Sequence, residues 1–240
     1  MKKSMKSGRA ACFDARKNPG NVGVRGERGF TLVELLTVIA IMAVVAGLVV
    51  GLAGVAGKAK RKARVTAELN QIVAAISSYQ AKYSGYPPQE GNNFAVNALY
   101  HELIGTKFTQ NNASLGDSTY ETPDGRVTLR QTDVQTIFSI GGFANVGEDS
   151  NTSGNNFLPT IKPNQTALFE QGGGTAQLLI VPAEAPAGKG VMAKTVEGDA
   201  RTVNPWRYNA SSPTNNPNSY DLWAEIQVGD ETIVIGNWDN

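Results

Sequence analysis

The sequence holds very little cysteine and histidine. Its 240 residues include one of each, Cys12 and His101. A single cysteine excludes an intrachain disulfide, so stability must come from packing. A lone histidine without metal-ligand spacing around it is far more often an ordinary residue than a ligand, and we assign it no role. No Ser/His/Asp arrangement and no nucleophilic cysteine can be placed, so we expect no enzymatic activity.

Basic residues are scarce in most of the chain. From Val65 onward, nine Lys or Arg face eighteen Asp or Glu. The remaining bases lie before Gly29 or between Lys58 and Arg64. Nucleic-acid binding needs a basic surface to contact phosphates, and the larger part of the chain lacks one. We therefore exclude nucleic acid as a partner.

Proline is absent between Phe30 and Tyr86, and this stretch opens with a long apolar run whose only charge is Glu34. Leu35 to Ala56 is long enough, at ~1.5 Å per helical residue, to cross a hydrocarbon core of ~30 Å. A cleaved secretory signal has a shorter apolar region, nearer the N-terminus. We expect a single membrane-spanning helix that contacts the lipid bilayer.

The helix is expected to continue beyond the apolar run as an amphipathic segment. One helix from near Phe30 to about Lys82 would be roughly 78 Å long. Gly85 and the following Tyr86-Pro87-Pro88 would end it. Apolar residues recur at alternating steps of four and three, so one face must be buried under a globular head: Val65, Leu69, Ile72, Ile76, Tyr79 and Tyr83.

The head is predicted to be a small α+β domain. A short helix from Phe94 to Ile104 would be capped by Asn92 or Asn93 and closed by Gly105. Residues 106–200, rich in Gly, Asn, Thr and Ser, read as a long insertion. Its predicted strands are Arg126–Arg130, Thr136–Ile140 and Ala176–Val181, with a flexible turn at Gly172–Thr175 and a surface loop at Pro182–Gly188.

The C-terminal segment is predicted to form a β-hairpin. Apolar residues alternate with polar ones from Tyr220 to Val228, the period of a half-buried strand. Gly229-Asp230 would make a tight turn, and Thr232 to Ile235 would return as the second strand. An antiparallel sheet packed on the long helix follows from these elements.

The residues around the start of the apolar run resemble a known processing motif. Arg25 to Gly29 precede Phe30-Thr31-Leu32-Val33-Glu34-Leu35-Leu36. This segment resembles the cleavage and methylation motif of type IV pilins and type II secretion pseudopilins. The resemblance implies cleavage between Gly29 and Phe30 by a prepilin peptidase and N-methylation of Phe30. It also implies that Glu34 pairs with the new N-terminus of a neighbouring subunit during filament assembly.

Glu34, and the glycines further along the apolar run, also have other interpretations. Thr31-x-x-Glu34 matches a capping box, in which the carboxylate satisfies a backbone amide at the helix start.

Many members of the pilin family carry proline where this chain has Gly51. The glycines from Gly47 to Gly57 would weaken the helix, or Gly47 and Gly51 would allow close helix packing, or they are small residues tolerated in lipid.

The later segments are similar to the major, G-type pseudopilin of type II secretion, and the absence of cysteine after Gly29 favours the pseudopilins. The family's calcium loop has shrunk here to Gly229-Asp230-Glu231. Calcium needs about 6–8 oxygen ligands, so Asp221, Asp230 and Glu231 are weak candidates, expected to be solvated, and we expect no cofactor. The similarity rests on these residues: Ala74–Tyr79, Gly85–Pro87, Asn204–Trp206, Tyr208, Tyr220–Trp223 and Asn237-Trp238.

Together these expectations describe a prepilin. Residues 1–29 would be a cleaved cytoplasmic leader, 30–57 the transmembrane and assembly helix, 58–84 its amphipathic second half, and 85–240 the head. The family resemblance implies a homopolymer in which the head lies in the periplasm and the helix in the bacterial inner membrane. Its partners would be the prepilin peptidase, minor pseudopilins and an inner-membrane assembly platform.

Two alternatives remain open at this point. A type IV pilus or competence-type pilin would share every feature before Tyr83. A periplasmic binding module with a single uncleaved membrane anchor would keep its leader and would not depend on Glu34. The sequence does not identify an exported cargo or the role of residues 106–200.

Overall fold

The computed structural model describes residues 29–195 and 198–238, without the side chains of residues 49–56. The leader therefore lies outside the described residues, Cys12 included. The chain divides into two compact units, with the boundary after Val50. In chain order the elements are α1 (Leu32–Tyr83), α2 (Leu99–Ile104), β1 (Lys107–Asn112), β2 (Asp117–Glu121), β3 (Thr128–Arg130), α3 (Gln131–Phe138), the 3₁₀ turn η1 (Pro163–Gln165), β4 (Thr166–Gln171), β5 (Gly174–Val181), β6 (Val191–Thr195), β7 (Ala200–Pro205), β8 (Arg207–Asn209), β9 (Asp221–Val228) and β10 (Glu231–Gly236).

The predicted long helix is confirmed as α1, which runs without a break from Leu32 to Tyr83. In the described part of the chain, no helix is long and apolar enough to cross a membrane. The predicted span, Leu35 to Ala56, includes residues 49–56, whose side chains lie outside the described part. Gly51 and Gly54, which are predicted to weaken or pack the helix, belong to the same stretch.

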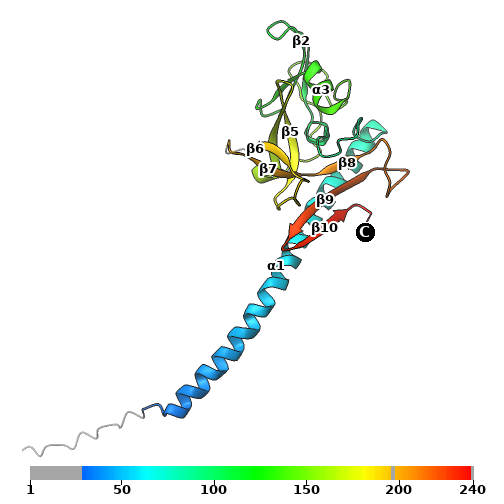
Figure 1. Ribbon diagram of the computed structural model, residues 1–240. Helices are drawn as coiled ribbons and strands as arrows, with labels where there is room; N and C mark the ends of the chain where they lie inside the picture. Colours follow the sequence, from blue (N-terminus) through cyan, green and yellow to red (C-terminus); the bar gives the residue numbers. More distant parts are fainter. Residues whose placement is uncertain (1–28, 196–197, 239–240) are drawn as a thin grey trace, which may run out of the picture. The chain divides into compact units, whose positions relative to one another are not determined.

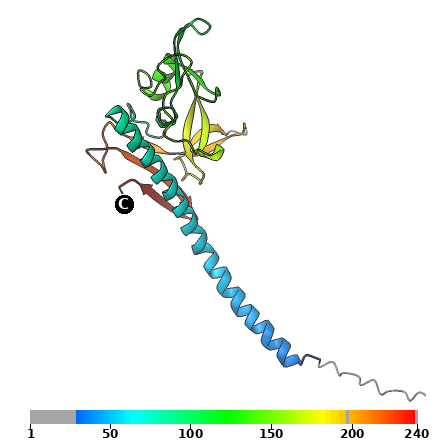
Figure 2. The same cartoon turned by 180° about the vertical axis from the view of Figure 1, so that it is seen from behind.

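The predicted stripe on the second half of α1 is buried from Val65 to Tyr79 and partly buried at Tyr83, and the C-terminal sheet covers it. Figures 1 and 2 show β9 and β10 beside this part of the helix. The antiparallel sheet has the order β10-β9-β8, which confirms the predicted hairpin and its turn at Gly229-Asp230. The core joins Leu69, Ile76 and Tyr79 of the helix to Leu222 and Ile226 of β9, all at most 1% exposed. The fold is α+β with a pilin-like arrangement.

The short helix is shorter than predicted, because a different asparagine organises its start. α2 begins at Leu99, not Phe94. Asn97 accepts a hydrogen bond from the Leu99 amide at 3.3 Å, and its own amide donates to the carbonyls of Phe94 and Trp206. These bonds hold residues 94–98 in a turn. Gly105 closes the helix as predicted, with φ of 78° and a bond from its amide to the His101 carbonyl.

The predicted strand at Thr136–Ile140 is wrong, since these residues belong mainly to α3. Val134, Ile137 and Phe138 are buried at helical spacing, a period that a five-residue window cannot reveal. The Asp133 carboxylate accepts a hydrogen bond from the Arg130 amide at 2.9 Å and so caps the start of the helix. The predicted strands at Arg126–Arg130 and Ala176–Val181 are confirmed in part by β3 and fully by β5.

Residues 106–200 form one three-stranded sheet and most of a small barrel, and side chains of both meet in a second hydrophobic cluster of the head. One is the sheet β1-β2-β3, and β4, β5 and β6 close a small barrel with β7 in the order β4-β5-β7-β6. Ala167, Ile180, Ala193 and Val203 fill a separate small cluster between these barrel strands. Leu179 of β5 is buried in the same cluster as the α1 stripe. Residues 106–200 are therefore an integral part of the head.

Candidate processing and assembly site

The predicted cleavage bond lies just before α1. Gly29 and Phe30 are outside the helix, and the Phe30 side chain is 84% exposed. A Cβ added at Gly29 would meet no atom of the described residues within 4 Å, apart from its chain neighbours. The packing of the described chain therefore does not require glycine here, and any such requirement must come from a molecule that binds this segment.

Thr31 and Glu34 form a complete capping box at the start of α1. The Glu34 Oε2 accepts hydrogen bonds from the backbone amide and the hydroxyl of Thr31, both at 2.8 Å. In return, the Thr31 hydroxyl oxygen accepts a 3.3 Å bond from the Glu34 amide. The capping box that the sequence suggested for Thr31 and Glu34 is thus present in the structure. Both side chains are exposed, so a partner molecule can reach the carboxylate.

The first described turns of α1 present apolar side chains on all sides. Exposed apolar surface is unfavourable in water by roughly 25 cal/mol per Å². A contiguous surface of this kind marks a region that binds a membrane or another protein. Between Phe30 and Leu48, the large apolar side chains that are 43–84% exposed are Phe30, Leu32, Val33, Leu35, Leu36, Val38, Ile39, Ile41, Met42, Val44, Val45 and Leu48.

The three calcium candidates are not brought together. Asp221 starts β9, whereas Asp230 and Glu231 lie in and after the turn at its other end, roughly 23 Å away at ~3.3 Å per strand residue. The prediction that Asp221 is solvated is wrong, because its residue is only 2% exposed. Its carboxylate accepts hydrogen bonds from the backbone amides of Thr214 and Asn216 at 2.7 and 2.9 Å. Asp221 therefore anchors the preceding loop with chain amides.

Asp230 and Glu231 are exposed, as predicted. Glu231 forms a long ion pair of 3.9 Å with Lys58 of α1. Within the described residues, no group of three or more His, Cys, Asp or Glu is arranged to hold a metal ion. His101 is buried in the core, where its Nε2 accepts a hydrogen bond from the Gln177 amide and its ring stacks on Phe143 at 4.8 Å. Burial lowers the pKa of His101 to about 3.

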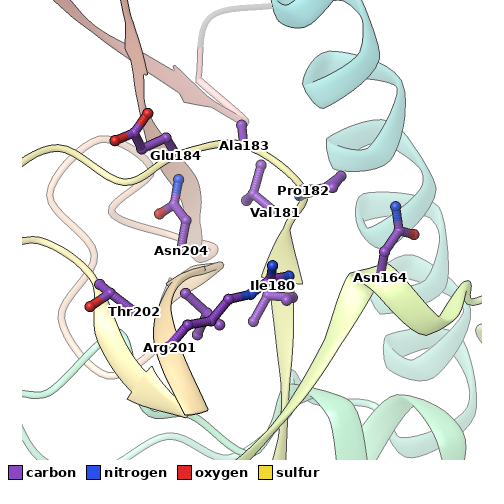
Figure 3. Close-up of a pocket in the computed structure, with 10 residues that line it drawn as sticks. Asn164, Ile180, Val181, Pro182, Ala183, Glu184, Arg201, Thr202 and Asn204 are labelled. Carbon is purple, nitrogen blue, oxygen red and sulfur yellow. The ribbon is translucent and has the colours of Figure 1, made fainter. Parts of the chain in front are cut away.

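A hollow of about 350 Å³ opens beside the small barrel. Figure 3 shows the Arg201 side chain extending toward Ile180 within it. The charged residues of its lining are Glu184 and Arg201. The lining residues come from η1, from β5 and the loop after it, and from β7: Asn164, Ile180, Val181, Pro182, Ala183, Glu184, Arg201, Thr202, Val203 and Asn204.

Comparison with known proteins identifies the N-terminal motif. Residues 24–50 match the family model described as the prokaryotic N-terminal methylation motif. No curated protein and no solved structure matches the chain. The chain thus carries a prepilin-type motif, which contains Gly29, Phe30 and Glu34, and the match does not extend to the head.

Proposed function

We propose that this chain is a prepilin that becomes a structural subunit of a type II secretion pseudopilus. The motif match over residues 24–50 carries the proposal. Cleavage between Gly29 and Phe30 would remove the leader, and methylation would follow on the new Phe30 amine. The exposure of both residues ahead of the helix supports access by a peptidase. A filament built in this way would support protein export.

Glu34 is proposed to pair with the N-terminus of a neighbouring subunit. The capping box engages Oε2, and within the described residues no hydrogen bond to Oε1 is found. That second oxygen is available to accept a hydrogen bond from a cationic amine. A charge near the membrane edge costs up to roughly 2.5–3.5 kcal/mol if drawn to the bilayer centre, so a cationic partner favours assembly. Cleavage would create that partner and so permit polymerisation.

The surroundings of the subunit follow from the same proposal. The exposed apolar side chains between Phe30 and Leu48 suit the inner membrane before assembly and contacts between helices after it. The head would lie in the periplasm, and the partners would be further copies of the chain, the prepilin peptidase, minor pseudopilins and the inner-membrane assembly platform. The C-terminal residues and the absence of cysteine after Gly29 favour the pseudopilus over a type IV pilus.

The N-terminal mass of the protein isolated from its native membrane tests the proposal. A chain that begins at N-methylated Phe30 is the expected result. A chain that retains Met1, or one cut near Gly57, would overturn it and favour an anchored binding module. Imaging then separates the two filament types, because filaments on the surface of intact cells would indicate a type IV pilus.

A further inference from the structure

The outward face of the C-terminal sheet carries an aromatic cluster beside a hollow. The Trp223 ring of β9 contacts the rings of Phe94 and Trp238, with centroid distances of 5.8 and 6.0 Å. All three rings are partly exposed. Alternation along β9 directs Leu222 and Ala224 into the core, and hence Trp223 to the opposite face.

The hollow next to Trp223 has a volume of about 350 Å³, within the range of roughly 300–1,000 Å³ that is typical of small-molecule sites. The turn that contains Lys189 forms another wall of this hollow. Gly190 holds this wall close to the barrel, since a Cβ there would lie 2.3 Å from Thr202 Cγ2. The lining residues are Asn93, Phe94, Ala95, Gly188, Lys189, Gly190, Val191, Arg207, Trp223 and Glu225.

Charged side chains line the hollow in a fixed arrangement. Glu225 lies 3.6 Å from both Lys189 Nζ and Arg207 Nε. The buried Arg207 also donates a hydrogen bond of 2.6 Å to the Lys189 carbonyl, so it ties the turn to the sheet. Lys189 has a side chain that is 56% exposed, and that of Glu225 is 16% exposed. Asn93 adds an exposed amide, so donors and an acceptor surround the rings.

We propose that this hollow binds a pyranose saccharide. A sugar ring has an apolar C–H face, which fits against the Trp223 ring, with the Phe94 ring tilted by 58° beside it, and a rim of hydroxyls, which fits the charged and amide groups around them. An extended peptide would need a free strand edge, but the outer edge of β8 is occupied by the bond from the Tyr208 amide to the Phe94 carbonyl. A nucleic acid would be repelled by the acidic excess of the chain beyond Val65.

Titration of the full-length protein with three trisaccharides tests this site. The probes are an N-acetylglucosamine trimer, cellotriose and trigalacturonate, each to about 10 mM, a range suited to weak binding. The detergent must lack a sugar headgroup. Tryptophan fluorescence reports stacking on Trp223, and calorimetry reports binding independently. A saturable response to at least one probe is expected, and no response to any of the three would overturn the proposal.

Variants link the response to the hollow. Trp223→Ala should weaken binding at least about tenfold, and Lys189→Ala, at an exposed side chain, should weaken it about threefold without affecting the fold. Met192→Ala is the matched control, because this exposed residue of β6 does not line the hollow. Thermal unfolding verifies each fold. Unchanged affinity in Lys189→Ala and in a folded Trp223→Ala would overturn the assignment, whether or not the chain is a pilin.

Discussion

The phenol of Tyr79, on the buried face of α1, donates a hydrogen bond of 3.0 Å to the carboxylate of Glu102 on α2. Glu102 is fully buried and also accepts bonds from the backbone amides of Ala144 and Asn145, at 2.8 and 3.0 Å. Burial raises the pKa of Tyr79 and, despite these hydrogen bonds, raises the pKa of Glu102. One carboxylate therefore links the long helix, the short helix and the loop at 144–145.

Tyr79→Phe should lower the free energy of unfolding by about 1–3 kcal/mol, because it removes one donor from a buried carboxylate and adds no cavity. Chemical denaturation of the purified protein measures this. The control is Ser77→Ala, whose exposed hydroxyl bonds only to a carbonyl of its own helix. Equal stability of Tyr79→Phe and the parent would show that the bond contributes nothing.

His101 should make stability depend on pH. Its pKa is about 3 in the folded state, whereas an unperturbed histidine titrates near 6.5. Between these values the unfolded chain binds a proton that the folded chain does not. Stability should therefore fall as pH falls below about 6.5, by up to about 1.4 kcal/mol per pH unit. His101→Gln should show a shallower slope in unfolding experiments between pH 4 and 7, and parallel slopes would contradict the prediction.

Gly29→Val should block removal of the leader and leave the fold unchanged. The described chain offers open space around Gly29, so the side chain should act only on the peptidase. Intact mass measures retention of the leader, and thermal unfolding of the head provides the control. Normal cleavage of this variant would contradict the assignment of the cleavage site to the bond between Gly29 and Phe30.

Glu34→Ala should insert into the membrane normally and fail to enter filaments. The variant Thr31→Ala separates assembly from capping, because it removes the hydroxyl of the capping box but keeps the Glu34 carboxylate. Loss of such a cap typically destabilises a helix by about 0.5–2 kcal/mol. Fractionation and filament pelleting measure both outcomes. Incorporation of Glu34→Ala at the parental level, or an equal defect in both variants, would contradict a specific assembly role for Glu34.

Chelation of calcium should leave the melting temperature of the protein unchanged. The substitution Asp221→Ala, by contrast, should lower the free energy of unfolding by on the order of 3 kcal/mol. The loop before β9 is held by backbone amides that donate to Asp221, and such bonds to a buried charged group are stronger than neutral ones. Scanning calorimetry with calcium or with a chelator tests both statements. A calcium-dependent rise in the melting temperature would show that the ion has ligands elsewhere.

Long periodic segments were predictable from the sequence, and short ones were less so. The α1 stripe and the alternation of β9 repeat often enough to fix both the element and its buried face. The errors at Phe94 and Thr136 concern elements of only six and eight residues, whose ends depend on side-chain bonds from Asn97 and Asp133. The Asn97 side chain also bonds to the distant Trp206 carbonyl, a contact that only folding creates, whereas the Asp133 bond is local and its spacing from Arg130 was available in the sequence.

The two candidate sites differ in the same way. The processing motif is continuous in sequence, so Gly29, Phe30 and Glu34 could be identified directly. The hollow at Trp223 combines residues near 93, 189, 207 and 223, which the sheet and its neighbouring turn bring together. The one available signal was the alternation of β9, which places Trp223 and Glu225 on the face away from the core.

The packing of Leu179 on the α1 stripe constrains how this subunit can evolve. Deleting residues 106–200 would uncover Ile72 of the helix, which belongs to the same cluster as Leu158 and Leu179 of this segment and lines one small cavity with them. Substitutions on this face of the helix and in this segment must therefore remain compatible with each other. Residues 106–200 are therefore a co-folding partner of the helix.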